Sequence, residues 1–113
     1  MMNAWIKNKN ICVAQKVKEA TSFQDRLVGL MFREKMNDFD ALLISPCNSI
    51  HTCFMKYPID VLFLDRNNKI VHMIKSMKPW RFSSLYLKSK KVLELNSGKI
   101  SKEIEIGDEV SFQ

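Results

Sequence analysis

The chain has 113 residues, of which 46% are hydrophobic and 27% are charged, a composition typical of an ordinary globular protein and not of a disordered or fibrous one. One domain over residues 1–113 is expected, because two halves would each be too small to bury a self-sufficient core. The formal net charge is +6, and the charges are unevenly spread, since residues 69–93 contain no acidic side chain.

The beginning of the chain contains no apolar run of the length that a signal peptide or a membrane span requires, because Lys7, Lys9 and Asn10 interrupt it. The chain has three cysteines, an odd and sparse set for a disulfide framework, so free thiols in a reducing compartment are expected. These features predict a cytoplasmic protein that does not contact a membrane.

Two strands and a helix are predicted in the first part of the chain. β-favouring residues at positions 4–6 and 11–17 indicate strands. In the stretch TSFQDRLVGLMFREKM, Thr21 or Ser22 can cap a helix, with an amide or acidic residue three positions later closing a capping box. Gly29, inside this helix, costs about 1 kcal/mol relative to alanine and indicates close approach of another backbone. Four apolar side chains are expected on one helical face: Phe23, Leu27, Leu30 and Met31.

Six further segments have the composition of short strands, namely residues 41–45, 49–55, 60–65, 69–75, 91–95 and 109–112. Asn67 and Asn68 tolerate left-handed backbone, so the segments on either side of them are expected to form an antiparallel hairpin. Many short strands with one helix do not fit a doubly wound sheet, in which the two alternate. The predicted fold class is α+β: a small, mostly antiparallel, barrel-like β-sheet with one principal helix packed on it.

Five motifs in a fixed order resemble the DUF192 family, also known as the uncharacterised UPF0127 proteins: DRLVGLMFREKM, SIHTCFMKYPIDVLFLDRNNKIV, KPWRFS, VLELNSG and IGDEV. The resemblance runs from about Ala20 to the end of the chain. It implies a small bacterial or archaeal protein of compact, β-rich fold with no established activity. Many members carry a signal peptide and a tryptophan where Phe54 stands here, so an export-linked role is not expected. The family's pattern falls on these residues: Arg26, Gly29, Leu30, Met31, Arg33, Met55, Lys56, Ile59 and Asp60.

The segment that begins at Cys47 concentrates soft and titratable side chains. On a strand, alternate residues would project from one face, and these are Cys47, Ser49, His51, Cys53 and Met55. Such a row suits Cu(I) or zinc. At roughly 3.3 Å per residue, His51 and Cys53 would lie about 7 Å apart and Cys47 and Cys53 about 20 Å apart, so at most two of them share a metal. We therefore expect these side chains to fill a core, with no metal and no cofactor.

A nucleophilic cysteine is the enzymatic alternative. A thiolate needs an imidazole to lower its pKa and a third group to orient that imidazole. Cys47 and Cys53 are the candidate thiols, and His51 and Asp60 are candidates for the other two groups. The sequence contains no phosphate-binding loop and no hydrolase motif. Whether the protein is an enzyme therefore stays open, the catalytic residues are unassigned, and a binding or accessory module is favoured.

A ligand pocket is predicted where the arginines of the helix meet the following strand. A cationic rim over an apolar floor favours a small anionic or amphipathic ligand, with a protein partner as the alternative. Asp60 shares an apolar face and so requires a partner, for which backbone N–H groups of the preceding turn are favoured over Arg26, Arg33 or His51. The candidate ligand-binding residues are Arg26, Arg33, His51, Met55, Lys56 and Asp60.

Residues 69–93 offer a second alternative, because basic side chains interleaved with Trp80, Phe82 and Tyr86 can neutralise phosphates and stack on bases. The segment matches no nucleic-acid-binding motif, and a solvated basic surface with aromatic core anchors explains it more simply. Nucleic-acid binding is therefore expected to be weak and non-specific at most.

Overall fold

The structure is a computed structural model of residues 1–113, and it describes all of them apart from the side chain of Phe23. Its strands are β1 (Met2–Ile6), β2 (Ile11–Ala20), β3 (Ala41–Ile44), β4 (Ile59–Leu64), β5 (Ile70–Met77), β6 (Lys91–Asn96) and β7 (Val110–Phe112). A short helix, α1 (Phe23–Val28), lies between β2 and β3. The strands match the predicted segments except for residues 49–55.

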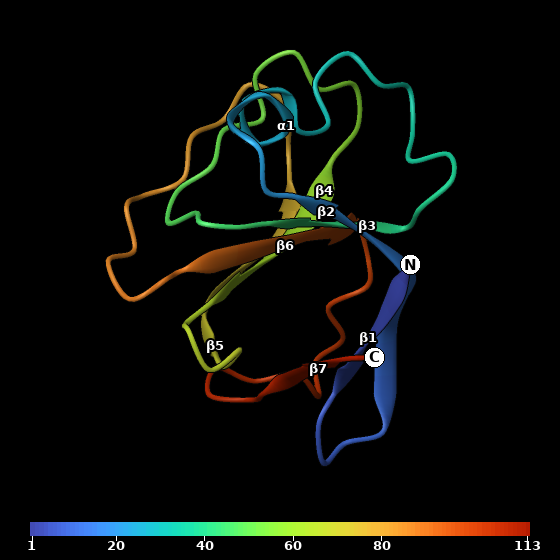
Figure 1. The fold of residues 1–113 in the computed structure, drawn as a ribbon, viewed down its shortest axis with the longest axis vertical. Helices are drawn as coiled ribbons and strands as arrows, with labels where there is room; N and C mark the ends of the chain where they lie inside the picture. Colours follow the sequence, from blue (N-terminus) through green and yellow to red (C-terminus); the bar gives the residue numbers. More distant parts are fainter.

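The seven strands form a sheet in the order β5-β4-β6-β3-β2-β1-β7. Neighbouring strands run antiparallel except β2 and β3, which are parallel because the chain crosses back over the sheet through α1. The two ends of the sheet approach each other, since a bridge joins Lys69 to Glu109 and the N–H of Ile70 donates to the Asp108 carbonyl oxygen at 2.8 Å. The sheet therefore curls into a half-barrel, with α1 over its outer face (Figure 1), and the predicted barrel-like sheet is confirmed.

The central strands are buried on both faces. Along β4, Leu62 and Leu64 face the inside of the curled sheet, whereas Val61 and Phe63 face the side that α1 covers. On β6 the same alternation places Leu93 and Leu95 inside and the two residues Val92 and Glu94 towards α1. The sheet thus separates an inner core from an outer core, and the outer core lies beneath the helix.

The fold is mostly β, and the predicted α+β class with one principal helix is wrong, because α1 has only six residues. Its start is as predicted, since the Ser22 hydroxyl accepts the N–H of Asp25 at 3.0 Å. It ends because Gly29 has a φ of +51° and a ψ of −122°, a conformation from which a helix cannot continue. The close backbone approach expected at Gly29 is also wrong: the nearest atom to a Cβ placed there would be Leu42 Cδ2, at 3.9 Å.

Because α1 ends early, the residues of the predicted apolar helix face differ in burial. Leu30, beyond the end of α1, is buried, and Met31 is half-buried. Leu27 is 59% exposed, and the side chain of Phe23 lies outside the described part of the chain. Burial at this end of the molecule therefore comes from the turn after α1 more than from the helix.

Residues 45–58, here named the cap segment, do not form the strand predicted over 49–55. Phe54 has a φ of +65°, which turns the chain out of an extended course. The only bridge in the segment joins His51 to Phe82. The segment is attached mainly to the loop before β6, for example through the N–H of Thr52, which donates to the Arg81 carbonyl oxygen at 2.9 Å. It therefore lies over the outer core, close to α1 (Figure 1).

Candidate functional site

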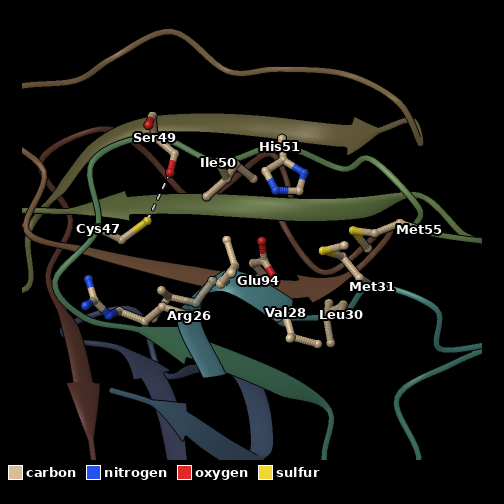
Figure 2. Close-up of a pocket in the computed structure, with 13 residues that line it drawn as sticks. Arg26, Val28, Leu30, Met31, Cys47, Ser49, Ile50, His51, Met55 and Glu94 are labelled. Atoms are coloured by element: carbon tan, nitrogen blue, oxygen red, sulfur yellow. Dashed lines mark hydrogen bonds between the residues drawn. The ribbon is translucent and has the colours of Figure 1, made fainter. Parts of the chain in front are cut away.

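A cavity of about 80 Å³ lies between α1, the cap segment and the outer face of the sheet. Its apolar lining includes Leu30, Ile44 and Ile50. Figure 2 shows how the side chains around it converge. The charged, polar and soft groups that reach it are Arg26, Met31, Cys47, Ser49, His51, Met55 and Glu94. The cavity thus gathers most of the chemically distinctive side chains of this half of the chain.

Glu94 lies in the middle of β6 and is only 3% exposed. Its partners on the adjacent strands are Leu42 and Val61, so it is flanked by apolar side chains. Oε1 of Glu94 is buried and has no hydrogen-bond partner among the protein groups that the structure describes. Burial raises the pKa of this carboxyl from its ordinary value of 4.5 to about 8. At pH 7 the group is therefore mostly protonated and is available to a partner inside the cavity (Figure 2).

Arg26 reaches the cavity from α1. Its Nη1 donates to the Pro46 carbonyl oxygen at 3.3 Å, which holds the guanidinium against the cap segment. Its Nε is buried and has no acceptor within the described part of the molecule. A guanidinium has five N–H donors, so Arg26 can still bind a further acceptor.

Cys47 is the cavity's thiol, and it donates to the Ser49 carbonyl oxygen at 3.1 Å. Burial raises the pKa of this thiol above its ordinary value, and the charge of Glu94 adds to the effect. The backbone of Ser49 and the charge of Arg26 oppose that rise without cancelling it. The thiol is therefore protonated at neutral pH and is a poor nucleophile.

His51 has a defined hydrogen bond within the cap segment: its Nδ1 accepts the N–H of Cys53 at 3.1 Å. In a neutral imidazole whose Nδ1 is an acceptor, the proton is on Nε2. Neither nitrogen then offers a free lone pair to a thiol proton or to a metal ion. Among the residues that the structure describes, no three His, Cys, Asp or Glu side chains gather as a metal site.

The predicted site residues are only partly brought together. Arg26, His51 and Met55 line the cavity, as does the candidate thiol Cys47. The other candidate thiol, Cys53, is not part of the lining.

Two predicted basic residues have partners elsewhere. Arg33 lies over the Phe39 ring, 5.3 Å from its centroid. Lys56 pairs with Glu34 at 2.7 Å on the exposed surface. Neither side chain lines the cavity, so Arg26 is the cation that the helix contributes to it.

Asp60 lies on the inner side of the sheet, away from the cavity, and is 1% exposed. It accepts three backbone N–H groups: Ser76 at 2.7 Å, Gly98 at 3.0 Å and Ile100 at 2.8 Å. The preference for backbone partners over Arg26, Arg33 and His51 agrees with this geometry, but the donors come from β5 and from the loop after β6, not from the preceding turn. Asp60 therefore joins three parts of the chain and cannot orient His51.

The aromatic residues of segment 69–93 divide into two groups. Tyr86 stacks on His72 with ring centroids 4.2 Å apart and so anchors the loop before β6. Trp80 and Phe82 are 56% and 77% exposed, so they are not the core anchors that the simpler explanation of this segment supposed.

Sequence reasoning missed Glu94, which is the most unusual group of the site. The signal was present in KVLEL, a predicted strand with one acid between aliphatic residues. A strand buried on both faces has no position where an ionised carboxyl is solvated, so such an acid requires a partner or a proton.

The family model of DUF192, described as "Uncharacterized ACR", matches residues 4–112. A UPF0127 protein of Pyrococcus horikoshii is 33% identical over 112 residues, which are 94% of this chain and 95% of that protein. Within the described part of the chain, no helix has the length and hydropathy needed to cross a membrane.

Two crystal structures have a similar fold. A protein of unknown function from Novosphingobium aromaticivorans has a TM-score of 0.74 at 17% identity, over 96% of this chain and 91% of that chain. A protein of Sinorhizobium meliloti 1021, named as a candidate transcription regulator, has a TM-score of 0.77 at 20% identity, over 99% of this chain and 94% of that chain. At these identities the likeness shows the fold alone.

Proposed function

Because the chain belongs to the DUF192 family, which is described only as uncharacterised, we propose its function from its own cavity: it is a small binding module that holds a ligand between α1 and the cap segment. The ligand enters beside α1 and contacts Glu94 on the floor. The proposal concerns reversible binding and not covalent catalysis, since the Cys47 thiol is protonated and Nδ1 of His51 is already an acceptor.

The observation that carries the proposal is the buried carboxyl of Glu94. Buried polar groups nearly always have hydrogen-bond partners, and leaving one without a partner costs about 1–3 kcal/mol. Glu94 has none among the described protein groups and lies at the surface of a cavity. A hydrophobic residue at this position would remove that cost. The carboxyl is therefore best explained by a partner that enters the cavity.

The cavity is smaller than a pocket for a drug-sized molecule, which is typically about 300–1,000 Å³. At about 80 Å³ it has room for roughly three water molecules at about 30 Å³ each. The enclosed part of the ligand is accordingly small. Exposed Leu27 and Val28 flank the cavity, so a longer ligand would lie against α1.

The setting that we propose is a cytoplasmic, reducing one. Its support is that Cys12, Cys47 and Cys53 are all free thiols, and Cys47 lines the cavity in the reduced form. Immunodetection of the native protein in separated cell fractions tests this part of the proposal, and recovery of the protein outside the cytoplasmic fraction would contradict it.

The binding proposal is tested by NMR titration of ¹⁵N-labelled protein with a library of small fragments sorted into cations, anions, zwitterions and neutral molecules. We expect at least one class to shift the backbone resonances of residues 26–30 and 49–51 in a saturable way. Val28→Trp, which adds bulk beside the cavity, should abolish these shifts. Leu85→Trp is the matched control, because Leu85 is 60% exposed and does not line the cavity.

A library in which no class causes saturable shifts at the cavity would refute the binding proposal. Saturable shifts that survive in Val28→Trp would place the binding elsewhere on the molecule.

A further inference from the structure

Two residues that line the cavity each carry a buried polar atom without a partner among the described protein groups, and the two atoms are of opposite kind. One is the acceptor Oε1 of Glu94, and the other is the donor Nε of Arg26. They belong to separate elements, β6 and α1, and both residues line the same cavity. We propose that the ligand is a small zwitterion, with an ammonium-type group for Glu94 and a carboxylate-type group for Arg26, as in an amino acid; this inference rests on the proposed function.

Glu94 selects the cationic end of the ligand. On the sheet its cross-strand neighbours Leu42 and Val61 offer no hydrogen bond from their side chains. An ammonium group in the cavity would supply both the missing donors and a compensating charge. Ion pairs that are hydrogen-bonded and shielded from water are the stronger kind.

Arg26 selects the anionic end. Its single hydrogen bond, to the Pro46 carbonyl oxygen at 3.3 Å, fixes the guanidinium beside the cap segment and leaves Nε available. Arginine presents its donors in a planar fork that matches a carboxylate. A carboxylate at this end of the cavity would therefore meet a positioned partner.

The electrostatic fields of Glu94 and Arg26 overlap within the cavity. The charge of Glu94 raises the pKa of the Cys47 thiol and the charge of Arg26 lowers it, so both charges act at one thiol that lines the cavity. Figure 2 shows Arg26, Glu94 and Cys47 around the same space. A ligand that contacts both Glu94 and Arg26 would therefore pass this thiol.

Ligands with one charge fit this pair less well. A carboxylate alone would satisfy Arg26 but leave Oε1 of Glu94 without a donor, and an amine alone would bring a second cation into the field of Arg26. A zwitterion is the class that satisfies both atoms. The volume of about 80 Å³ is that of roughly three water molecules at about 30 Å³ each, which limits the enclosed part of the ligand to the size of the smallest amino acids.

Binding of such a ligand is coupled to a proton. An ammonium group requires ionised Glu94, so binding below pH 8 releases the proton of this carboxyl. Four titratable or charged residues surround Glu94: Arg26 on α1, and Cys47, His51 and Tyr57 on the cap segment. The strands on either side, β3 and β4, place only the apolar residues Leu42 and Val61 beside it. Affinity should therefore rise with pH up to about 8, by close to tenfold from pH 6 to pH 7.

The test compares three probes that share a two-carbon frame: L-alanine, propionate and ethylamine. Each is titrated into ¹⁵N-labelled protein at pH 7.5, and dissociation constants are taken from the shifts of residues 26–30 and 49–51. We expect L-alanine to bind at least tenfold more tightly than either single-charge probe. Its affinity should also follow the pH dependence given above.

Charge-removing variants assign the two ends. Glu94→Gln should lower the affinity for L-alanine about tenfold and leave that for propionate unchanged, whereas Arg26→Gln should spare ethylamine and weaken L-alanine. Glu19→Gln and Arg66→Gln, both on the exposed surface, are the matched controls and should bind like the parent protein.

Each other outcome overturns the inference. Propionate or ethylamine binding as tightly as L-alanine would show a singly charged ligand, and the binding function would survive. Failure of all three probes, while another fragment class still shifts the cavity resonances, would reject the zwitterion alone. Failure of all three together with the whole fragment library would reject both proposals.

Discussion

Replacing Glu94 with glutamine should make the protein more stable at alkaline pH while weakening the proposed binding. The side chains have nearly the same shape, so Glu94→Gln keeps the packing against Leu42 and Val61. Glutamine does not titrate, whereas the buried carboxyl must either keep its proton or be ionised without a partner. The variant therefore removes one electrostatic cost and nothing else from the fold.

The direction and size of the change in stability with pH follow from the pKa values of Glu94 in the folded protein and in the unfolded chain. In the folded protein the pKa of Glu94 is about 8, and in the unfolded chain it returns to about 4.5. Between these values the unfolded chain releases a proton that the folded protein retains, so stability falls as pH rises. Each pH unit removes about 1.4 kcal/mol at most, and the loss from pH 5 to pH 8 is about 3 kcal/mol.

The assay is urea unfolding followed by tryptophan fluorescence at pH 5, 6.5 and 8, for the parent protein and Glu94→Gln. The difference between their unfolding free energies should be within about 1 kcal/mol at pH 5 and should favour the variant by about 3 kcal/mol at pH 8. Glu19→Gln, at an exposed position of β2, is the control and should show no such pH dependence.

A difference that stays constant from pH 5 to pH 8 would refute the reasoning, because it would mean that Glu94 ionises normally in the folded protein. A variant that is more stable at pH 8 and binds L-alanine about tenfold more weakly would show instead that the carboxyl is retained for function at the expense of stability.

Four other expectations are open to direct measurement. Asp60→Ala should lower the unfolding free energy by roughly 1–3 kcal/mol, because three backbone N–H groups lose their acceptor; Asp60→Asn keeps one of the two acceptor oxygens and should recover only part of the loss in thermal melts. Thr52→Val should cost roughly 1–3 kcal/mol by urea unfolding, since the hydroxyl of this fully buried residue donates to the Lys78 carbonyl oxygen at 2.6 Å; an unchanged midpoint would contradict this. Gly29→Ala should cost about 1–3 kcal/mol in the same assay because its φ of +51° strains any other residue. Binding of single-stranded nucleic acid should be weaker than about micromolar at physiological salt and should decrease further in Trp80→Ala; tight, salt-resistant binding measured by fluorescence anisotropy would refute it.

Local patterns were sufficient for most of the sheet. Alternating and β-branched residues marked the strands, because side chains on a strand alternate between its two faces. Asn68 has a φ of +63°, in agreement with the predicted turn between β4 and β5. The Ser22 cap was also readable, since it depends on atoms only a few positions apart.

The length of α1 and the course of the cap segment were not readable in the same way. The stretch after Val28 is apolar enough to continue a helix, and residues 49–55 are apolar enough to form a strand. The left-handed φ angles of Phe32 and Phe54 instead accompany a packed aromatic pair, with ring centroids 5.1 Å apart. A contact between two separate loops outweighed the local preferences there.

The candidate site shows the same division. Arg26, Cys47, His51 and Met55 attracted attention by residue type, and all four line the cavity. Asp60 was named among the ligand-binding candidates but does not line the cavity, and Glu94 was overlooked. Asp60 accepts three backbone N–H groups, whereas Oε1 of Glu94 has no hydrogen-bond partner among the described protein groups. The difference depends on which backbone groups and side chains lie next to each carboxyl, and only the folded chain brings those groups together.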